Sequence, residues 1–254
     1  MSKPLLQLDK VTVQFGGLKA VSEVSFSIGE GELVGLIGPN GAGKTTVFNL
    51  ITGVYQPTAG NITFAGRPVK GHRASKITAR GIARTFQNIR LFSSLNVFDN
   101  VRTACNMHLR HGIAHALTRG PAFSREEAGI EKSVLELLEI FGLQSERDVP
   151  CKSLSYGDQR RLEIVRALAT RPKLLLLDEP AAGMNPTEKT ELMELIRFTQ
   201  EKFGCAVLLV EHDMKVVMGI CQRINVLDYG KKIAEGTPDE VKRNPDVIKA
   251  YLGS

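Results

Sequence analysis

Short apolar runs separated by polar turn residues fill the first part of the chain. Runs of about four to eight residues bounded by glycine, proline or asparagine are typical of β-strands. A helix is expected from about Gly43 to Thr52, after the most continuous of these runs. The strands that the pattern predicts are Leu5–Leu8, Val11–Phe15, Val24–Ile28, Leu33–Ile37 and Asn61–Phe64.

Helical patterns dominate the middle of the chain, between about residues 86 and 170. The best-defined helix covers Arg125–Phe141, because its apolar residues return with helical spacing on one face. Gly142 follows it as a C-cap. Residues 105–122 have no clean period, and a longer connection is expected there.

After Pro172 apolar runs alternate with helical segments. Continuous apolar strands that alternate with helices are typical of a mostly parallel sheet covered on both faces. We therefore expect an α/β core into which a helical subdomain is inserted. The strands predicted here are Leu174–Leu177, Ala206–Val210, Arg223–Leu227 and Lys231–Ala234, and the helices are Pro186–Lys202 and Asp213–Met218.

The composition is that of an ordinary globular protein. The 254 residues suit one large domain or two small ones, and 43% hydrophobic and 24% charged residues argue against a disordered, collagen-like or membrane-embedded chain. The four cysteines show no metal or redox spacing, which suits a reducing compartment. No secretory signal is expected in the charged first ten residues, and the apolar runs are too short to cross a bilayer.

The formal net charge of +6 arises in one region of the chain. No Asp or Glu occurs between Leu33 and Phe98, whereas the remainder carries 25 basic and 27 acidic side chains. A local excess of this kind favours an anionic partner, whether nucleic acid, a membrane surface or a phosphate ligand. The eight cations of the region are Lys44, Arg67, Lys70, Arg73, Lys76, Arg80, Arg84 and Arg90.

A stretch matching GxxxxGK[ST] follows the strand at Leu33–Ile37 and opens the next helix. In this context the pattern binds nucleotide phosphates, through backbone N–H groups of the loop and the helix N-terminus. Lys44 is expected to neutralise the β- and γ-phosphates, and the Thr45 hydroxyl to ligate Mg²⁺. The residues expected to bind the nucleotide are Gly38, Pro39, Asn40, Gly41, Ala42, Gly43, Lys44, Thr45 and Thr46.

A second helix N-terminus with small residues lies at Leu154-Ser155-Tyr156-Gly157-Asp158-Gln159. Ser155 alone indicates an ordinary N-cap. The same start also leaves backbone donors where an anion could bind. If both helix ends serve one nucleotide, they can come from two different subunits, with ATP between them.

The predicted strand at Leu174–Leu177 leads directly into Asp178-Glu179-Pro180. In a protein with a phosphate loop, an aspartate that ends a buried strand is placed to hold Mg²⁺, usually through water. The neighbouring Glu179 could polarise an attacking water as a general base.

Together these motifs resemble the ATP-binding subunit of ABC transporters, over essentially the whole chain. The resemblance implies a P-loop NTPase fold of the ABC type: an α/β core with a mostly parallel sheet and an antiparallel β subdomain, and an inserted helical subdomain. It implies ATP and Mg²⁺ as ligands. By the same resemblance Asp178 is the Walker B aspartate and Glu179 the catalytic glutamate, while Ser155 and Gly157 contact the γ-phosphate bound to the opposite subunit.

Three further residues take a role only from the resemblance. Gln87 matches the Q-loop residue that senses Mg²⁺ and the lytic water, so it is expected among the catalytic residues and the metal ligands. His212 matches the switch histidine near the γ-phosphate, and Phe15 matches the aromatic that stacks on adenine. Taken one at a time, Gln87 would be interpreted as a solvated amide, His212 as a structural histidine and Phe15 as a core aromatic. Their order relative to the phosphate loop favours the functional roles.

The chain departs from the commoner family form at two positions. Tyr156 replaces one of the two glycines of the signature sequence. Asn185 stands where the family usually has an aspartate, which keeps hydrogen bonding across a dimer possible and removes a charge.

Several stretches most resemble the larger ATPase subunit of high-affinity branched-chain amino-acid importers: Leu154–Glu163, Asp178–Asn185, Glu211–Ile220 and the chain end from Gly236. The resemblance implies one ABC ATP-binding domain over residues 1–254. Its expected parts are a nucleotide-binding core (1–86 and 171–254), a helical subdomain (87–170) and a helical tail (236–254).

The resemblance also implies ATP hydrolysis that powers import of branched-chain, hydrophobic amino acids. The implied partners are a second ATPase subunit, with a heterodimer favoured over a homodimer, integral membrane permease subunits and an extracytoplasmic solute-binding protein; no nucleic acid is expected. The chain would be peripheral on the cytoplasmic face of the inner membrane and soluble when isolated. Residues 88–92 are expected to contact the permease, and some cations between Arg67 and Arg90 to face the permease and anionic lipid headgroups.

Other classes remain open. The ATPase of another solute importer or of a lipopolysaccharide exporter would share these motifs, because the transported molecule never touches this subunit. A non-transport ABC ATPase acting on nucleic acid commonly carries tandem domains, coiled coils or zinc-binding insertions. A small-molecule kinase would need an acceptor site and no signature helix.

Overall fold

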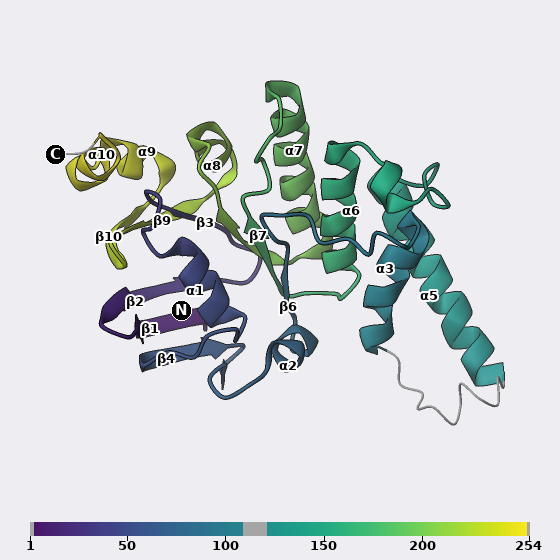
Figure 1. Cartoon of the computed structure of the whole chain (residues 1–254), viewed down its shortest axis with the longest axis horizontal. Coiled ribbons are helices and arrows are strands. Elements are labelled where there is room, and N and C mark those ends of the chain that lie inside the picture. The colour runs from purple at the N-terminus through teal and green to yellow at the C-terminus, as the bar shows by residue number, and fades with distance from the viewer. Residues whose placement is uncertain (1–2, 109–120, 253–254) are drawn as a thin grey trace. The chain divides into compact units, whose positions relative to one another are not determined.

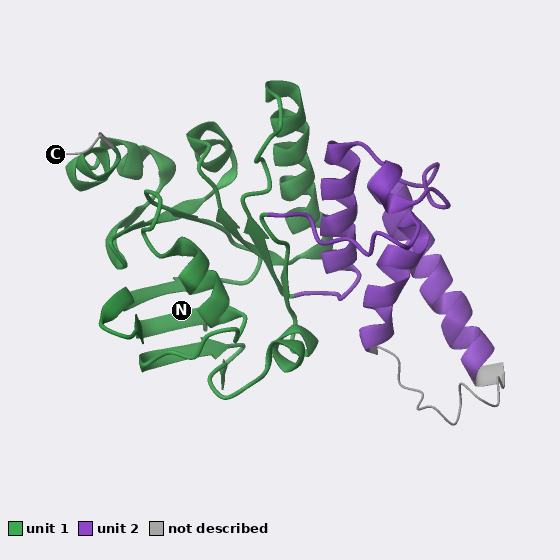
Figure 2. Cartoon of the chain, in the orientation of Figure 1, with its two compact units in different colours: residues 1–87, 173–254 green, residues 88–172 purple. Residues whose placement is uncertain are grey.

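The computed structural model describes residues 3–108 and 121–252 (Figure 1). Their contacts form two compact units: unit 1 lies within residues 1–87 and 173–254, and unit 2 within residues 88–172 (Figure 2). In the described part of the chain, no helix has the length and apolar character needed to cross a bilayer.

Unit 1 contains two sheets. The larger has the strand order β10-β9-β3-β8-β7-β6, and its neighbouring strands are parallel except β10 and β9. The smaller is antiparallel, with the order β2-β1-β4-β5. The strands are β1 (Leu6–Phe15), β2 (Leu18–Ile28), β3 (Leu33–Ile37), β4 (Ala59–Phe64), β5 (Arg67–Pro68), β6 (Ile82–Arg84), β7 (Leu174–Asp178), β8 (Ala206–Val210), β9 (Arg223–Asp228) and β10 (Lys231–Gly236).

Helix α1 (Lys44–Ile51) joins the two sheets of unit 1. Its buried residues Val47, Phe48 and Ile51 belong to one apolar core with residues of both sheets, and Figure 1 shows the helix between them. The remaining helices of the unit are α2 (Ala74–Ala79), α7 (Pro186–Phe203), α8 (Met214–Ile220), α9 (Pro238–Arg243) and α10 (Pro245–Leu252).

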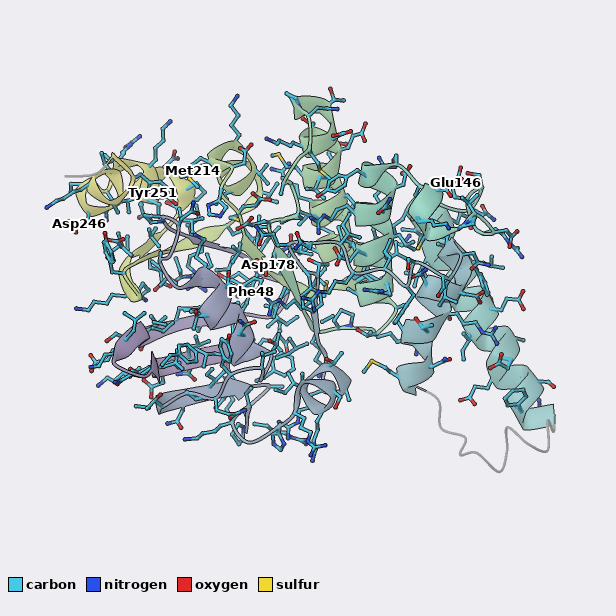
Figure 3. All side chains as sticks on the ribbon, viewed as in Figure 1. Phe48, Glu146, Asp178, Met214, Asp246 and Tyr251 are labelled. Atoms are coloured by element: carbon cyan, nitrogen blue, oxygen red, sulfur yellow. The ribbon has the colours of Figure 1, made fainter. Side chains whose placement is uncertain are left out.

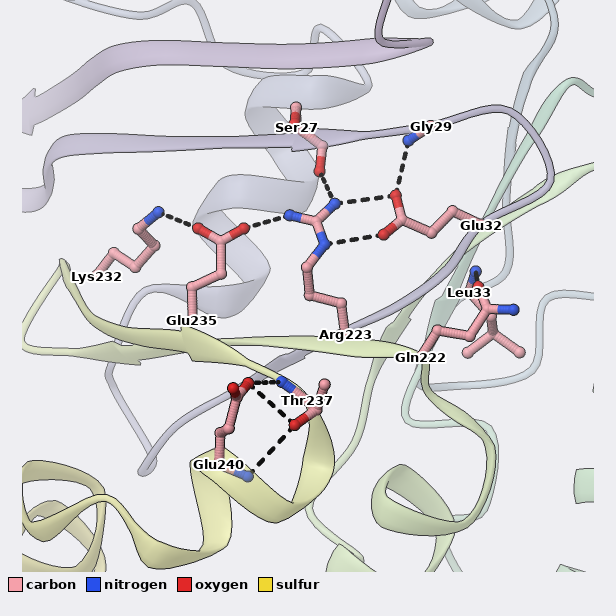
Figure 4. A network of polar contacts seen from close by, with 10 residues as sticks. All are labelled: Ser27, Gly29, Glu32, Leu33, Gln222, Arg223, Lys232, Glu235, Thr237 and Glu240. Atoms are coloured by element: carbon pink, nitrogen blue, oxygen red, sulfur yellow. Dashed lines mark hydrogen bonds and ion pairs between the residues drawn. The ribbon is translucent and has the colours of Figure 1, made fainter. Parts of the chain in front are cut away.

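A network of partly exposed ion pairs and hydrogen bonds also ties the two sheets together (Figure 4). Arg223, at the start of β9, holds both carboxylate oxygens of Glu32 at 2.8 and 2.9 Å. The same guanidinium donates to the carbonyl of Ser27 in β2 and contacts Glu235 in β10. Because β3 starts directly after Glu32, the network fixes the strand that leads into the phosphate loop.

Unit 2 is helical. Helix α3 (Val97–Cys105) packs against both α5 (Pro121–Ile140) and α6 (Tyr156–Leu168), and two short 3₁₀ turns cover Asn106–His108 and Cys151–Ser153. Each of the three helices has a fully buried apolar residue: Val101 in α3, Val134 in α5 and Leu162 in α6.

Several predicted boundaries were wrong, each for a local reason. Strand β1 is continuous where the pattern predicted a break, because Lys10 takes a positive φ of 45° and forms an irregularity in the register rather than a turn. Helix α5 begins at Pro121, earlier than the predicted Arg125. Helix α2 and strand β6 were not predicted, since the first buries only Ile77 and the second has three residues. Residues 109–120 of the expected long connection lie outside the described residues.

Candidate active site

The phosphate loop connects β3 to α1 and takes a conformation that glycine allows. Gly38 has a φ of 151°, and a Cβ there would lie 2.1 Å from the carbonyl oxygen of Leu227. Gly43 has a φ of 102°, and a Cβ there would lie 2.8 Å from the carbonyl oxygen of Ala20. The loop therefore packs its backbone directly on neighbouring strands, with no room for side chains at these two positions.

A cavity of about 420 Å³ opens over this loop. Its volume is in the range of small-molecule sites, about 300–1,000 Å³. The predicted residues Asn40, Gly41, Ala42, Gly43, Lys44, Thr45, Thr46, Glu179 and His212 line it, together with Leu18, Lys19, Ala20, Tyr229 and Gly230.

Lys44 holds a positive charge inside the loop. Its Nζ donates to the carbonyls of Gly38 at 2.7 Å and Pro39 at 2.9 Å. Burial lowers the pKa of Lys44, and the carboxylates of Glu179 and Asp178 oppose this effect. The loop thus carries a partly desolvated cation at the N-terminus of α1, and both the cation and the helix end attract a phosphate.

The carboxyl ends of three neighbouring parallel strands bring Gln87, Glu179 and His212 together. Gln87 Nε2 donates to Glu179 Oε2 at 2.7 Å, and His212 Nε2 lies 2.7 Å from Glu179 Oε1. Strand β7 pairs with β6 on one side and with β8 on the other, so the residues after each strand meet at one edge. Glu179 has a φ of 48°, an uncommon conformation that is found at functional sites.

Asp178 is buried at the end of β7 and is paired. Arg84 Nη2 lies 2.7 Å from Asp178 Oδ2, and Arg84 Nη1 donates to Asn49 at 2.7 Å. The guanidinium also lies over the rings of Phe48 and Phe86, 5.4 and 5.2 Å from their centroids. In Figure 3 the labelled Phe48 and Asp178 lie at the centre of unit 1. Arg84 is one of the eight cations of the acid-free region, and only 9% of its side chain is exposed because it pairs with Asp178 inside unit 1.

The predicted Mg²⁺ ligands offer a suitable donor set. Thr45 contributes a hydroxyl, Asp178 a carboxylate and Gln87 an amide, and Mg²⁺ prefers such hard oxygen ligands. Thr45 lines the cavity, whereas Asp178 is bound to Arg84 and Gln87 to Glu179 through its amide nitrogen. The residues present therefore fit the cation.

Phe15 does not line the cavity. Its ring is half exposed and meets Tyr55 edge to face, with the centroids 5.0 Å apart. The aromatic that lines the cavity is Tyr229, in the turn between β9 and β10, and it is 87% exposed. The sequence pattern places Tyr229 only between the predicted strands Arg223–Leu227 and Lys231–Ala234. Nothing local shows that Gly230 N–H donates to the carbonyl of Ala42 in the phosphate loop at 3.0 Å.

Ser155 and Gly157 lie in unit 2 at the start of α6. Ser155 Oγ accepts the N–H of Asp158 at 3.1 Å and is thus the N-cap of the helix. A Cβ on Gly157 would meet only the Ser155 hydroxyl, at 3.9 Å, so the helix start is open around this glycine. The Ser155 hydroxyl donates to the Asp158 carboxylate at 2.7 Å, so the first turn carries a negative charge beside this open space.

Comparison with known proteins agrees with the nucleotide-binding site that the geometry describes. The family model for ABC transporters matches residues 21–182, and a model of the branched-chain amino acid ATP-binding cassette transporter matches residues 231–254. The high-affinity branched-chain amino acid transport ATP-binding protein LivG of Salmonella typhimurium is 48% identical over 253 residues, which cover 100% of this chain and 99% of LivG.

The chain belongs to the ABC transporter ATPase family.

Solved structures of ABC ATPases share its fold. The ADP conformation of MJ1267, an ATP-binding cassette of an ABC transporter, has a TM-score of 0.85 at 29% identity and covers 100% of both chains. The cbiO1 protein of Clostridium perfringens, part of the ABC transporter complex cbiONQ, has a TM-score of 0.83 at 30% identity, over 98% of this chain and 94% of cbiO1. The predicted α/β fold of the P-loop class is confirmed, and the chain is a nucleotide-binding ATPase.

Both departures of this ABC ATPase from the common family sequence have local structural partners. The ring of Tyr156 lies 5.9 Å from the guanidinium carbon of Arg160, which donates to its hydroxyl at 3.3 Å. Arg160 is fully buried and pairs with Glu163 at 2.8 Å. Asn185 is the N-cap of α7 and forms a reciprocal capping box with Glu188.

Proposed function

We propose that this ABC ATPase powers the import of branched-chain, hydrophobic amino acids through partner membrane subunits. The identity to LivG over its full length and the match of residues 231–254 to a branched-chain transporter model support this substrate class. The geometry that supports the chemistry is Glu179, held between Gln87 and His212 beside the phosphate loop.

In this proposal ATP binds in the cavity over the phosphate loop. Lys44 would neutralise the β- and γ-phosphates, and Thr45, Asp178 and Gln87 would hold Mg²⁺. The cation would neutralise charge that develops on the phosphate oxygens. Because Phe15 does not line the cavity, the adenine would have to extend beyond the lining residues to stack on its half-exposed ring.

Hydrolysis then depends on Glu179. As general base it takes a proton from the attacking water, whose oxygen forms a bond to the γ-phosphorus. The bond from that phosphorus to the bridging oxygen breaks, and ADP and inorganic phosphate leave. Gln87 and His212, each 2.7 Å from one carboxylate oxygen, orient the base.

The working unit would be a dimer, with a heterodimer favoured. Two ATPase subunits close head to tail, and Ser155 and Gly157 of each contact the γ-phosphate bound to the other. Unit 2 then takes the part of the helical subdomain. Closure would be driven by ATP, since a ligand shifts the equilibrium toward the state that it binds better.

The permease would contact residues 88–92 of unit 2. Phe92 is 52% exposed there, and its ring lies 5.3 Å from the guanidinium carbon of Arg166. The backbone of the segment is held by two side chains: Arg90 N–H donates to Glu163 at 3.3 Å and Phe92 N–H to Asn100 at 2.9 Å. A solute-binding protein would deliver the amino acid to the permease, and the ATPase would lie peripherally on the cytoplasmic face of the membrane.

The catalytic proposal is tested with Glu179→Gln. The variant should lose at least about a hundredfold in kcat, because general-base catalysis contributes about 10²–10⁴-fold. It should still bind ATP and, together with the partner ATPase subunit, elute as a closed dimer in size-exclusion chromatography with ATP. Glu194→Gln, an exposed carboxylate of α7, is the matched control and should turn over normally. Normal turnover by Glu179→Gln would contradict the role of the base.

The transport proposal is tested by identifying the membrane proteins that co-purify with the tagged chain. The complex, reconstituted in vesicles with its binding protein, should take up leucine, isoleucine and valine only with ATP. An ATP-hydrolysing complex that ignores these amino acids and moves another solute, or extracts lipopolysaccharide, would overturn the substrate class and leave the catalytic proposal intact.

A further inference from the structure

Glu211 is a buried carboxylate that joins two loops at the edge of the larger sheet. It directly follows β8 and is 3% exposed. Its Oε1 accepts the N–H of Ala181 at 2.6 Å, and its Oε2 accepts the N–H groups of His212 at 3.0 Å and Asp213 at 3.3 Å. Ala181 belongs to the loop that follows Glu179, so one side chain binds the backbone of both loops.

We propose that Glu211 is a positioning residue for hydrolysis, whose carboxylate fixes residues 180–185 relative to His212. This inference rests on the proposed function, in which His212 orients Glu179. The bond from His212 Nε2 to Glu179 Oε1 closes a ring that runs from Glu179 through Ala181, Glu211 and His212 back to Glu179. A shift of either loop would therefore move the imidazole away from the carboxylate of the base.

The contact requires one side chain with two acceptor atoms, one for the N–H of each loop. An ionised carboxylate accepts at both oxygens, whereas a glutamine amide accepts at its oxygen and donates at its nitrogen. In Glu211→Gln, the N–H groups of one loop would face another donor. Aspartate keeps both acceptors but is one methylene shorter, so it cannot reach both loops in the same geometry.

Simple stabilisation does not account for this residue. Burial raises the pKa of Glu211, and the charge of Glu179 adds to that effect, while three backbone N–H groups oppose it. An ionisable group kept beside a like charge is costly to fold. The helix α7, which follows the first loop, is already linked at the surface to the second loop, where Lys189 lies 2.7 Å from Asp213.

This surface pair supplies a matched control. Lys189→Met removes the outer link and leaves the carboxylate of Glu211 with its three donors. Both loops would then keep their place at the catalytic edge.

The experiment compares Glu211→Gln, Glu211→Asp and Lys189→Met with the wild type in kcat, KM for ATP and Tm. Misplaced catalytic groups can lose large factors in rate, and Glu211→Gln should lower kcat by about tenfold or more. The variant would keep the contacts that bind ATP equally in the ground state and the transition state, so its KM for ATP should stay within about twofold of the wild-type value. The kcat of Glu211→Asp should lie between those of Glu211→Gln and the wild type. The kcat of Lys189→Met should stay within about twofold of the wild type, because exposed ion pairs contribute little.

A second measurement reports on the imidazole itself. In protein labelled at histidine, the ring signal of His212, assigned with His212→Gln, should shift in Glu211→Gln in the same direction as in Glu179→Gln. If Glu211→Gln does not fold, the Asp variant carries both readouts.

The results separate the two proposals. Unchanged kcat and an unmoved His212 signal in the Glu211 variants would overturn the positioning role. Equal losses in the Glu211 variants and Lys189→Met would do the same, because the effect would then not be specific to the carboxylate of Glu211. A Glu179→Gln variant with normal turnover would instead overturn the proposed function.

Discussion

Arg84 and Asp178 form an ion pair of 2.7 Å in which 9% and 5% of the two side chains are exposed. Their strands β6 and β7 are parallel neighbours, and the guanidinium also reaches Asn49 of α1. The aspartate at the end of β7 is therefore neutralised from the strand beside it, and the same arginine connects it to the helix that follows the phosphate loop.

The first prediction concerns this pair. Arg84→Met leaves a buried carboxylate without its partner, and breaking a buried pair from one side costs about 3–5 kcal/mol. The free energy of unfolding, measured in urea, should fall by that amount. The double variant Arg84→Met/Asp178→Asn should regain part of it, since no uncompensated charge remains.

Arg73→Met removes an exposed cation of the same acid-free region and is the control. It should change the free energy of unfolding by no more than about 0.5 kcal/mol. Equal effects of Arg73→Met and Arg84→Met would show that the pair with Asp178 does not hold the site together.

The second prediction concerns Tyr156 in the signature sequence. Tyr156→Gly restores the commoner family form but removes the ring that lies over Arg160. Loss of the cation–π contact and of helix propensity should lower the free energy of unfolding by about 1–2 kcal/mol. Tyr156→Phe keeps the ring face and loses only a 3.3 Å hydrogen bond, so it should cost about 0.5 kcal/mol. If the Gly variant is as stable as the wild type, the pair with Glu163 alone holds Arg160.

The third prediction concerns Asn185, which caps α7. Asn185→Ala should lower the free energy of unfolding by about 1 kcal/mol, whereas Asn185→Asp should stay within about 0.5 kcal/mol, because both Asn and Asp accept at an N-cap. Thermal unfolding measures both. With stability held, any change in steady-state ATP hydrolysis by Asn185→Asp then reports the added charge. An Ala variant as stable as the wild type would contradict the capping role.

The phosphate loop and the acids after β7 could be predicted from the sequence because each is local. A buried strand followed by glycines or by Asp-Glu defines its own geometry. The meeting of Gln87, Glu179 and His212 needed the resemblance to a family as well, because it depends on β6, β7 and β8 being neighbours. The hydrophobic pattern within one strand does not indicate which strands are its neighbours in the sheet.

Arg84 and Glu211 were missed for the same physical reason. Their partners Asp178 and Ala181 lie 94 and 30 residues away in the chain, and both contacts exist only once the parallel sheet has formed. An arginine in an acid-free stretch is usually solvated, so composition pointed away from a buried pair. The one local signal is position: Arg84 closes an apolar strand three residues before Gln87.

The last prediction is a pH dependence at the surface link between α7 and α8. The hydrogen bond from Lys189 lowers the pKa of Asp213, and the N–H groups of Lys215 and Val216 add to the effect. A carboxyl group whose pKa is lower in the folded state stabilises the fold above its unfolded pKa, near 3.9, and loses that contribution as the pH falls through the folded value.

The variant Asp213→Asn tests this dependence, because it removes the charge and keeps an N-cap acceptor for α8. At pH 7 the Asp213→Asn variant should have a free energy of unfolding lower by about 0.5–1 kcal/mol, as expected for a partly exposed pair. The difference from the wild type should stay constant from about pH 7 to pH 5 and shrink toward zero below about pH 4. Lys189→Met should reproduce the same profile, because it removes the other partner of the same bond. A difference that stays constant down to pH 3, where both forms still fold, would show that the ionised carboxylate of Asp213 is not the source of the stabilisation.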